Sequence, residues 1–379
     1  MKVLIDMTFV SQKTLHNSIP IVVFRLLGGI PPSERSKFKL LFDRGCVEML
    51  HNMFPDYEYT TVNVYNNRRH YYDPRLLLCP FNLKRAINNS GCDIVFFPCD
   101  GNRYAIFKFN IPIIVMIHDL KWLKSDTKND HSKFIVRLFS SIRGHRAYRE
   151  KIESASKIVT ISQYTKSDLL SFFPNTDPSK IHVIYNSIPL IEGSRKPSSL
   201  SDDEKYVLNI NSILSLKNPL TLLKAFSLIA DNYKGKLVLV GRKTVYWDEE
   251  LEPFIEKNKL EDKVIRLQNI DDEEIRYLYE HADLFVTPSL HEGFGLTPVE
   301  AAIYCCPVIS SRCESLPEAT MGLVNYYEPA TDENALAKEM RTILSNPPSR
   351  SQLKEISKTL TERYTPSNQA KELLSLLDI

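Results

Sequence analysis

The stretch that decides the predicted fold reads Ser289-Leu290-His291-Glu292-Gly293-Phe294-Gly295-Leu296-Thr297-Pro298-Val299-Glu300-Ala301-Ala302. A short apolar run, Leu284–Val286, comes directly before it. Glycines between a strand and a helix let the backbone approach a ligand closely, and the free N–H groups of the helix start favour an anion such as a diphosphate. The stretch therefore predicts a strand, a ligand-binding loop and a helix.

Short β-branched runs followed by segments of helical period recur on both sides of this stretch, which is typical of parallel sheets with crossover helices. In the first half we expect strands at Lys2–Ile5, Asp93–Phe97, Ile111–Ile117, Lys157–Ile161 and His182–Tyr185. In the second half we expect them at Tyr206–Ile210, Lys236–Val240, Val264–Leu267, Leu284–Val286 and Pro307–Ser310. The pattern predicts two doubly wound, Rossmann-like α/β domains.

The length of 379 residues also favours two domains, because single cores usually split beyond roughly 250 residues. Residues 187–201 are rich in Pro, Ser and Gly and are interpreted as the linker. We therefore expect domains at 1–190 and 202–350. Residues 351–379 should form a helical segment, broken near Pro366, that packs back on the N-terminal domain.

Composition is that of an ordinary globular protein, with 43% hydrophobic and 25% charged residues. The opening residues do not resemble a signal peptide and no apolar run has the length of a membrane span, so we expect a cytoplasmic location. The seven cysteines include no C-x-x-C pair, which favours reduced thiols over a disulfide framework or a zinc site.

Charge is unevenly distributed although the net charge is only +2: residues 1–190 carry +10 and the remainder −8. Residues 131–151 combine an apolar helical face with basic flanks, among them Lys151. One interpretation is a core-facing helix with solvated charges; the other is peripheral contact with anionic lipid at the inner face of the membrane. Nucleic acid is not an expected partner, because no binding motif occurs.

Two glutamates of the opening stretch are candidates for ligand binding. Glu292 lies in the loop and can accept hydrogen bonds from sugar hydroxyls. Glu300 lies about two helical turns further on and can face the same ligand. The alternative is a glycine-bearing loop whose glutamates are merely solvated.

The spacing of Glu292 and Glu300 resembles the Glu-x7-Glu motif of the retaining family 4 glycosyltransferases, and the Pro307-Val308 turn follows as in that family. The resemblance implies a GT-B fold, in which two Rossmann-like domains face each other across a cleft. It also implies that Glu292 acts on the donor sugar and that Glu300 binds the ribose. Backbone contacts to sugar and phosphate would come from Gly293, Phe294, Gly295, Leu296 and Thr297.

The segment 211–219 resembles the family's Gly-Arg…Lys-Gly element, whose cations neutralise the donor diphosphate. Lys217 matches the lysine, whereas Ser212 replaces the arginine. Arg242 or Lys243, after the apolar run that ends at Gly241, are candidates to compensate. A diphosphate leaving group without a metal needs at least one such cation.

Three further positions follow strands of the first half. His118 resembles the family's histidine at the cleft edge and is assigned with Glu292 to the catalytic group. Asp119 is expected to be a helix cap or an ion-pair partner. Ser162 is a candidate contact to acceptor or phosphate, with a helix N-cap as the alternative.

The reaction that the resemblance implies is transfer of a hexose, with retention, from a GDP- or UDP-linked donor to a glycan or lipid-linked acceptor in polysaccharide biosynthesis. Mannose from GDP is the first choice. No Asp-x-Asp motif stands where a metal-dependent transferase would need it, so no metal and no cofactor is expected. The alternatives are a nucleotide-sugar epimerase and a non-catalytic sugar-binding protein, and Ser212 favours the latter.

Overall fold

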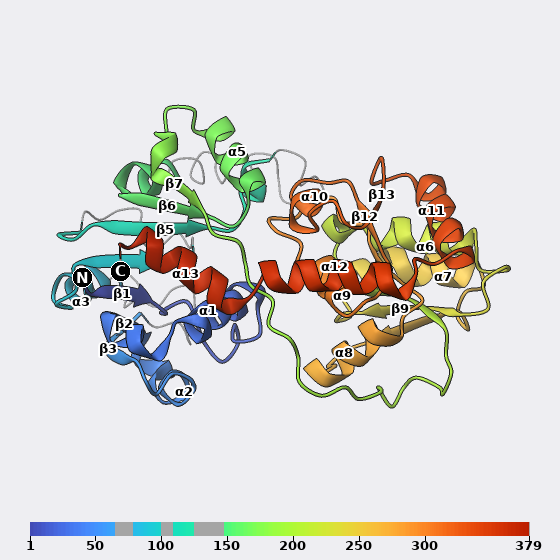
Figure 1. The fold of residues 1–379 in the computed structure, drawn as a ribbon, viewed down its shortest axis with the longest axis horizontal. Coiled ribbons are helices and arrows are strands. Elements are labelled where there is room, and N and C mark those ends of the chain that lie inside the picture. Colours follow the sequence, from blue (N-terminus) through green and yellow to red (C-terminus); the bar gives the residue numbers. More distant parts are fainter. Residues whose placement is uncertain (65–78, 100–108, 125–147, 379) are drawn as a thin grey trace. The chain divides into compact units, whose positions relative to one another are not determined.

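The computed structural model describes residues 1–64, 79–99, 109–124 and 148–378 (Figure 1). The chain divides into two compact units. Unit 1 comprises Met1–Ser187 and Thr365–Ile379, and unit 2 comprises Ile188–Tyr364.

The described part of unit 1 contains a seven-stranded parallel sheet of order β3-β2-β1-β4-β5-β6-β7. The strands are β1 (Val3–Asp6), β2 (Phe38–Asp43), β3 (Glu58–Val62), β4 (Ile94–Phe97), β5 (Ile113–Ile117), β6 (Lys157–Thr160) and β7 (Ile181–Val183). The five predicted strands are confirmed, while β2 and β3 were not predicted. β3 is half exposed, so its side chains lack an apolar signal.

Unit 1 closes with the C-terminal helix of the chain, which lies beside its first helix (Figure 1). The helices among its described residues are α1 (Ser18–Gly29), α2 (Val47–Met53), α3 (Cys79–Asn88), α5 (Gln163–Phe172) and α13 (Pro366–Leu376). Short 3-10 turns are η1 (Pro32–Lys37), η2 (Arg44–Cys46), η5 (Lys121–Leu123) and η6 (Pro178–Lys180). A Cβ atom on Gly29 would lie 2.1 Å from the carbonyl oxygen of Pro366, so the helices can approach this closely because residue 29 has no side chain.

Unit 2 contains, within its described residues, a six-stranded parallel sheet of order β10-β9-β8-β11-β12-β13. The strands are β8 (Tyr206–Ile210), β9 (Lys236–Val240), β10 (Val264–Leu267), β11 (Leu284–Thr287), β12 (Val308–Ser311) and β13 (Asn325–Tyr327). All but β13 were predicted. The chain order reverses between β8 and β11, and doubly wound sheets bind ligands at the carboxyl ends of such a strand pair.

Except for the last two, which follow β13, the helical segments of unit 2 connect these strands. They are η7 (Ser215–Lys217), α6 (Pro219–Ser227), η8 (Trp247–Leu251), α7 (Glu252–Lys257), α8 (Asp272–His281), α9 (Leu296–Ile303), α10 (Leu316–Ala319), α11 (Glu333–Ser345) and α12 (Arg350–Arg363). Helix α12 packs against α9, the helix of the opening stretch.

The observed units differ from the predicted domain boundaries in two places. The expected linker is held on unit 2, because Arg195 pairs with the carboxylates of Asp271 and Glu274 at the start of α8. The tail is helical with a break at Pro366, as predicted, but α12 belongs to unit 2 and only α13 to unit 1. The hydroxyl of Tyr364 donates to the carbonyl of Ala319 at 2.8 Å and holds the end of α12 on unit 2.

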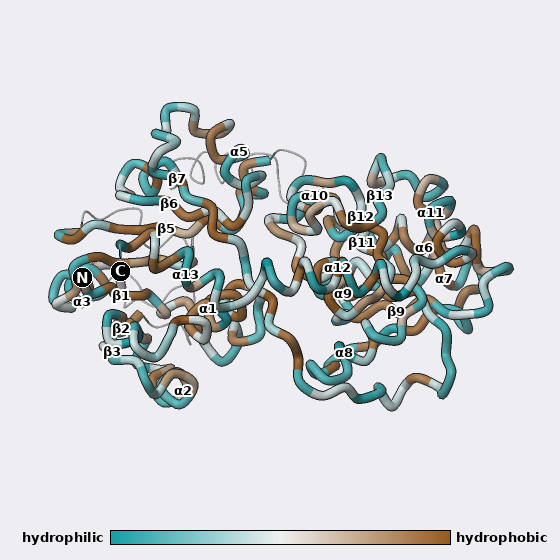
Figure 2. Tube along the Cα trace, viewed as in Figure 1, coloured by the Kyte–Doolittle hydropathy of each residue, from teal (hydrophilic) through white to brown (hydrophobic). Residues whose placement is uncertain are grey.

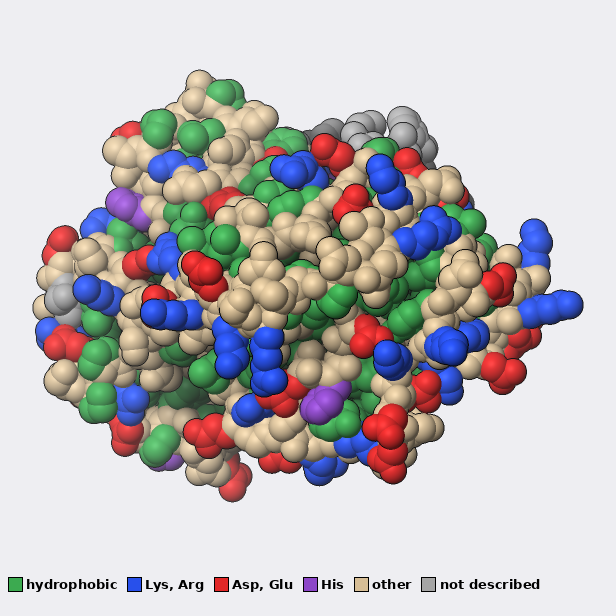
Figure 3. Space-filling view, turned by 45° about the vertical axis from the view of Figure 1, so that its right-hand side comes forward, with side chains coloured by type: hydrophobic (Ala, Val, Ile, Leu, Met, Phe, Trp, Pro, Cys, Tyr) green, Lys and Arg blue, Asp and Glu red, His purple; other side chains and the backbone are tan. Residues whose placement is uncertain are grey.

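Each unit has its own apolar core, and the strands of both appear as brown runs in Figure 2. On the face that Figure 3 shows, acidic and basic side chains are interspersed. Among the described residues, no helix combines the length and hydrophobicity needed to cross a membrane.

Most of the basic segment 131–151 lies outside the described residues. In its described end, Lys151 is 4% exposed and its ammonium lies 4.8 Å from the ring centre of Tyr148. The expectation that Lys151 is a solvated basic flank is wrong, because its ammonium is buried over an aromatic ring.

Candidate functional site

The loop 288–295 follows β11 at the point where the chain order of the unit 2 sheet reverses. Its last residue, Gly295, has φ +99°, and a Cβ atom there would lie 2.5 Å from Cδ2 of Leu316. The position requires glycine for both reasons. This turn starts α9 directly at Leu296 and leaves the first N–H groups of the helix without a side-chain cap.

Side chains at and after the end of the neighbouring strand β12 hold this loop. The Ser311 hydroxyl donates to the carbonyl of Ser289 at 2.6 Å. The Ser315 hydroxyl lies within bonding distance of two loop carbonyls, those of Glu292 at 2.8 Å and Phe294 at 3.0 Å. The Phe294 ring is 3% exposed and packs edge-on against Tyr364. The loop is thereby anchored through its carbonyls and one buried ring.

Glu292 and Lys217, both predicted site residues, form an ion pair in unit 2. The Nζ atom of Lys217 lies 2.7 Å from Oε1 of Glu292, and the Ser289 hydroxyl donates to the same oxygen at 2.8 Å. The two charged side chains are 24% and 12% exposed. Lys217 ends the turn η7 after β8, so the adjacency of β8 and β11 brings the two charges together.

Asn218 fixes the position of this lysine, a role that the sequence analysis missed. It adopts a left-handed conformation with φ 55°, and its amide donates to the carbonyls of Pro288 and Ala330 at 3.1 and 2.9 Å. The N–H of Leu290 also donates to the carbonyl of Leu216 at 2.9 Å. The lysine turn and the glutamate loop are therefore joined by one main-chain hydrogen bond and by the side chain of Asn218.

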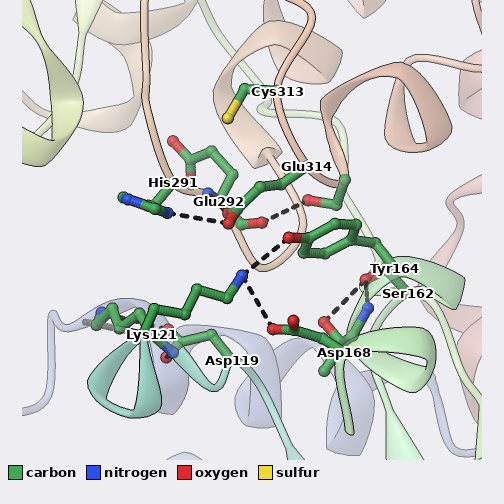
Figure 4. A network of polar contacts seen from close by, with 12 residues as sticks. Asp119, Lys121, Ser162, Tyr164, Asp168, His291, Glu292, Cys313 and Glu314 are labelled. Atoms are coloured by element: carbon green, nitrogen blue, oxygen red, sulfur yellow. Dashed lines mark hydrogen bonds and ion pairs between the residues drawn. The ribbon is translucent and has the colours of Figure 1, made fainter. Parts of the chain in front are cut away.

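Glu314 is a second residue that the sequence analysis missed. Its Oε2 accepts the backbone N–H of Glu292 at 2.7 Å, and its Oε1 lies 2.9 Å from Nδ1 of His291 (Figure 4). The signal that could have found it is position: Glu314 follows β12, which pairs with β11, and the carboxyl ends of neighbouring parallel strands lie at one edge of a sheet.

Glu300 lies in the second turn of α9, where its carboxylate accepts a hydrogen bond from Tyr279 of α8 at 3.2 Å. Burial, and after it the charge of Glu300, raise the pKa of Tyr279 well above its ordinary value. The phenol therefore keeps its proton and remains a hydrogen-bond donor to this glutamate.

The cations considered as substitutes for the missing arginine differ in their surroundings. Lys243 pairs with Asp248 at 2.7 Å and Glu252 at 3.1 Å, so its charge is already offset. Arg242 is exposed and has neither an ion pair nor a hydrogen bond with the rest of the described chain. Ser212 is exposed on the loop after β8, the strand that pairs with β9. Of the two cations, Arg242 is the one whose charge is open to a ligand.

His118 follows β5 in unit 1 and is 7% exposed. Its Nε2 lies 2.7 Å from the carbonyl oxygen of Pro98, which follows β4. A carbonyl only accepts, so Nε2 carries a hydrogen. The predicted contact of His118 with the donor stays a prediction.

Ser162 is the N-cap of α5, and its buried hydroxyl accepts the N–H of Thr165 at 3.0 Å. The helix-capping alternative therefore describes what Ser162 does here. Asp119 is an ion-pair partner, as expected, 3.2 Å from Nζ of Lys121. Nearby on α5, the side chains of Tyr164 and Asp168, which Figure 4 labels, hold the ammonium of Lys124 at 2.8 and 3.0 Å.

Within the described ranges, no three His, Cys, Asp or Glu side chains form a group that could hold a metal ion. The expected independence from metals remains a prediction about activity.

The sequence matches two families of known proteins. The family described as Glycosyl transferases group 1 matches residues 191–360, and the one described as Glycosyltransferase Family 4 matches residues 42–191. The first match covers most of unit 2, and the second lies almost wholly in unit 1.

Similar curated proteins come from archaea and bacteria. A glycosyltransferase of Methanocaldococcus jannaschii is 27% identical over 236 residues, which are 59% of this chain and 60% of that protein. The O-antigen chain mannosyltransferase RfbU of Salmonella typhimurium is 30% identical over 192 residues, which are 51% and 52% of the two chains. The chain thus spans about half the length of the curated relatives it matches.

Solved structures resemble the whole chain. The Anabaena protein HepE in complex with UDP and glucose gives a TM-score of 0.73 at 16% identity, covering 100% of this chain and 99% of HepE. The sucrose-phosphate synthase of Thermosynechococcus elongatus gives 0.72 at 18% identity, covering 100% and 98%. These likenesses confirm the predicted GT-B class of fold, with two Rossmann-like parallel-sheet domains.

Proposed function

We propose that this chain, which matches the families Glycosyl transferases group 1 and Glycosyltransferase Family 4 in consecutive segments, is a family 4 glycosyltransferase that transfers a hexose from a nucleotide-diphosphate sugar to a hydroxyl of a glycan or lipid-linked acceptor. The observation that carries this proposal is the pair formed by Lys217 and Glu292 at the carboxyl ends of β8 and β11. An ammonium suits a diphosphate, and a carboxylate suits sugar hydroxyls. The pair thus offers the two recognition groups that a nucleotide sugar needs in one place.

The proposed chemistry assigns these groups to the departing diphosphate and to the sugar. As the sugar–oxygen bond breaks, negative charge grows on the phosphate, and Lys217 stabilises it more than it stabilises the ground state. Glu292 accepts hydrogen bonds from the sugar hydroxyls, and Glu300 receives the ribose. Retention of the anomeric configuration is part of the proposal and rests on the resemblance of the Glu-x7-Glu segment to retaining enzymes.

Mannose from GDP is the first donor to test, because two relatives are O-antigen mannosyltransferases. UDP-glucose is the second, because HepE, which shares the fold, was solved with that compound. The proposed acceptor is a growing surface polysaccharide or its lipid-linked precursor.

A non-catalytic sugar-binding protein is the second candidate function, and the serine at position 212 in place of an arginine favours it. Arg242 weighs against it, because an exposed guanidinium on the loop after β9 can supply the second positive charge. An epimerase remains a third outcome of the assay.

The deciding experiment measures turnover of GDP-mannose and UDP-glucose with and without acceptor. A transferase releases nucleoside diphosphate faster when acceptor is added and forms a product of unchanged anomeric configuration, which the one-bond coupling between C1 and its hydrogen reports. An epimerase interconverts sugars without acceptor, and a binding protein shows neither reaction. Glu292→Ala should lower donor affinity or turnover with the fold intact; unaltered kinetics in this variant would argue against the site.

Activity should also survive EDTA, because the proposed charge stabilisation comes from side chains. Complete loss that magnesium or manganese restores would contradict this part of the proposal. Binding of UDP against GDP can be compared by thermal shift, since a ligand at a hundred times its dissociation constant stabilises the folded state by about 2.7 kcal/mol.

A further inference from the structure

Glu314 connects two neighbouring residues of the donor loop through one carboxylate. Oε2 accepts the N–H of Glu292 at 2.7 Å, and Oε1 lies 2.9 Å from Nδ1 of His291. The Glu314 side chain is 11% exposed and that of His291 is 21% exposed. Hydrogen bonds to a charged, mostly buried carboxylate are stronger than those between neutral groups. The contact therefore restrains both residues of the loop.

The backbone of Glu314 is strained, which points to a use for this side chain. Its φ is +48°, a conformation that residues with a Cβ rarely adopt. In extended chain, successive side chains point to opposite sides. Here Cys313, Glu314 and Ser315 all hydrogen-bond to the donor loop, the first through the carbonyl of Leu290. The left-handed residue lets three consecutive side chains face one loop, and strain of this kind concentrates at functional sites.

The carboxylate also decides the hydrogen-bonding role of the histidine. A carboxylate can only accept, so Nδ1 of His291 carries the hydrogen, and in the neutral ring Nε2 keeps the lone pair. Among the described residues, Nε2 has no hydrogen-bond partner. When the ring is neutral, Nε2 therefore presents an acceptor on the residue adjacent to Glu292.

We propose that Glu314 is a positioning residue that holds the amide of Glu292 and sets Nε2 of His291 as an acceptor for a hydroxyl of the donor sugar. This inference rests on the proposed function for its substrate. The inference goes beyond the proposed function, because Glu314 touches no substrate and acts through His291 and Glu292 of the donor loop.

Glu314→Gln separates shape from charge. The amide oxygen still accepts the N–H of Glu292, but the amide NH2 now faces Nδ1 of His291 and must donate to it. The neutral ring then carries its hydrogen on Nε2, so the acceptor becomes a donor. The backbone and the volume of the side chain stay the same, and the fold should be retained.

The first measurement reports the ring directly. We expect nitrogen NMR of histidine-labelled protein at about pH 8.5, where histidines are ordinarily neutral, to show hydrogen on Nδ1 of His291 in the wild type and on Nε2 in Glu314→Gln. A His291→Asn variant assigns the resonances. The same tautomer in both proteins, or Nε2–H in the wild type, would overturn the inference.

The second measurement is kcat/KM with the donor that the wild type turns over. Glu314→Gln should lower it by roughly ten- to a hundredfold, the scale of a small misplacement of reacting groups. In a His291→Ala background the same change should add less than about threefold, because residues that act through one another are not additive. Two losses that simply multiply would show that Glu314 does not act through His291.

A matched pair of glycine variants controls for backbone strain. Glu314→Gly accepts φ +48° without strain and removes the carboxylate, so the fold should persist while kcat/KM falls as in Glu314→Gln. Met321→Gly makes the same change at an exposed residue of φ 52° and should leave kcat/KM unchanged. Wild-type kcat/KM in Glu314→Gly would overturn the inference. A wild type that turns over no donor would refute the proposed function instead, and the tautomer measurement would still decide the role of Glu314.

Discussion

The ammonium of Lys217 and the carboxylate of Glu292 lie 2.7 Å apart, although they belong to loops that follow different strands. The pair is mostly sheltered from solvent, so its electrostatic energy is larger than that of an exposed pair. Ser289 donates to the same carboxylate oxygen, so this oxygen of Glu292 has two partners. A diphosphate that replaces Glu292 as the partner of Lys217 would bind an ammonium whose position is already fixed.

We expect Lys217→Ala to reduce turnover on the order of a hundredfold or more, because one charge-stabilising donor at the leaving group is lost. Lys217→Arg should keep part of the activity. Lys236 is the control, because it also pairs with a glutamate, Glu204 at 3.3 Å, and its side chain is 32% exposed. It lies at the start of β9, at the amino ends of the strands and away from the site. Lys236→Ala should leave turnover unchanged. If Lys217→Ala works within about threefold of the wild type, the lysine is a surface residue.

Arg242→Ala should weaken binding of GDP or UDP more than Lys243→Ala does. The reason is that Asp248 and Glu252 already offset the charge of Lys243, whereas Arg242 is exposed. Calorimetric titration of both variants with each nucleoside diphosphate measures the difference. Wild-type affinity in both variants would mean that no cation on this loop replaces the arginine missing at Ser212.

Tyr279 should make unit 2 sensitive to alkali. Its folded-state pKa is raised above 10.0 by burial and then by Glu300, so its contribution to stability is complete below about pH 10 and is lost as the pH rises further. At about pH 11 the phenol has ionised in the unfolded chain, and the free energy of unfolding has fallen by about 1.4 kcal/mol for each buried tyrosine.

Tyr279→Phe tests this by removing the ionisable group. Urea unfolding at pH 8 and pH 11 should show a smaller alkaline loss in the variant than in the wild type, by about 1.4 kcal/mol. Tyr277→Phe, on the same helix but partly exposed, serves as the control. An alkaline loss that Tyr279→Phe does not reduce would show that this phenol ionises as readily in the folded protein as in the unfolded chain.

Vesicles of anionic lipid should retain the protein at low salt if the basic segment 131–151 contacts the membrane. The motivation is the +10 charge of residues 1–190. Retention should fall with salt, because the screening length drops from about 10 Å at 0.1 M to about 3 Å at 1 M.

Neutralising Arg137, Arg143 and Arg146 to glutamine should abolish this retention. The matched control neutralises three exposed lysines of unit 2, Lys234, Lys257 and Lys259. Co-sedimentation with phosphatidylglycerol and phosphatidylcholine vesicles compares them. Equal behaviour of the wild type on both lipids would favour a soluble acceptor.

Local sequence was sufficient for the elements of each sheet and for part of the site. Apolar runs bounded by turn residues predicted ten strands. The order strand, loop and helix around Glu292 follows from nearby residues, because Gly295 readily adopts the left-handed turn that starts α9. These features depend on residues close together in the chain, where backbone conformation and capping are decided locally. Lys217 and Glu300 were likewise identified from motifs of a few residues.

Only the tertiary structure decided which of these residues meet. The adjacency of β8, β11 and β12 places Lys217 and Glu314 against the loop of Glu292, and the sequence order of the strands does not state this adjacency. The packing of α8 beside α9 gives Glu300 its tyrosine partner. The tail divides between units because α12 packs on α9 and α13 on α1, contacts between surfaces formed only after the sheets are assembled. Such contacts join residues far apart in the chain, and no local propensity specifies them.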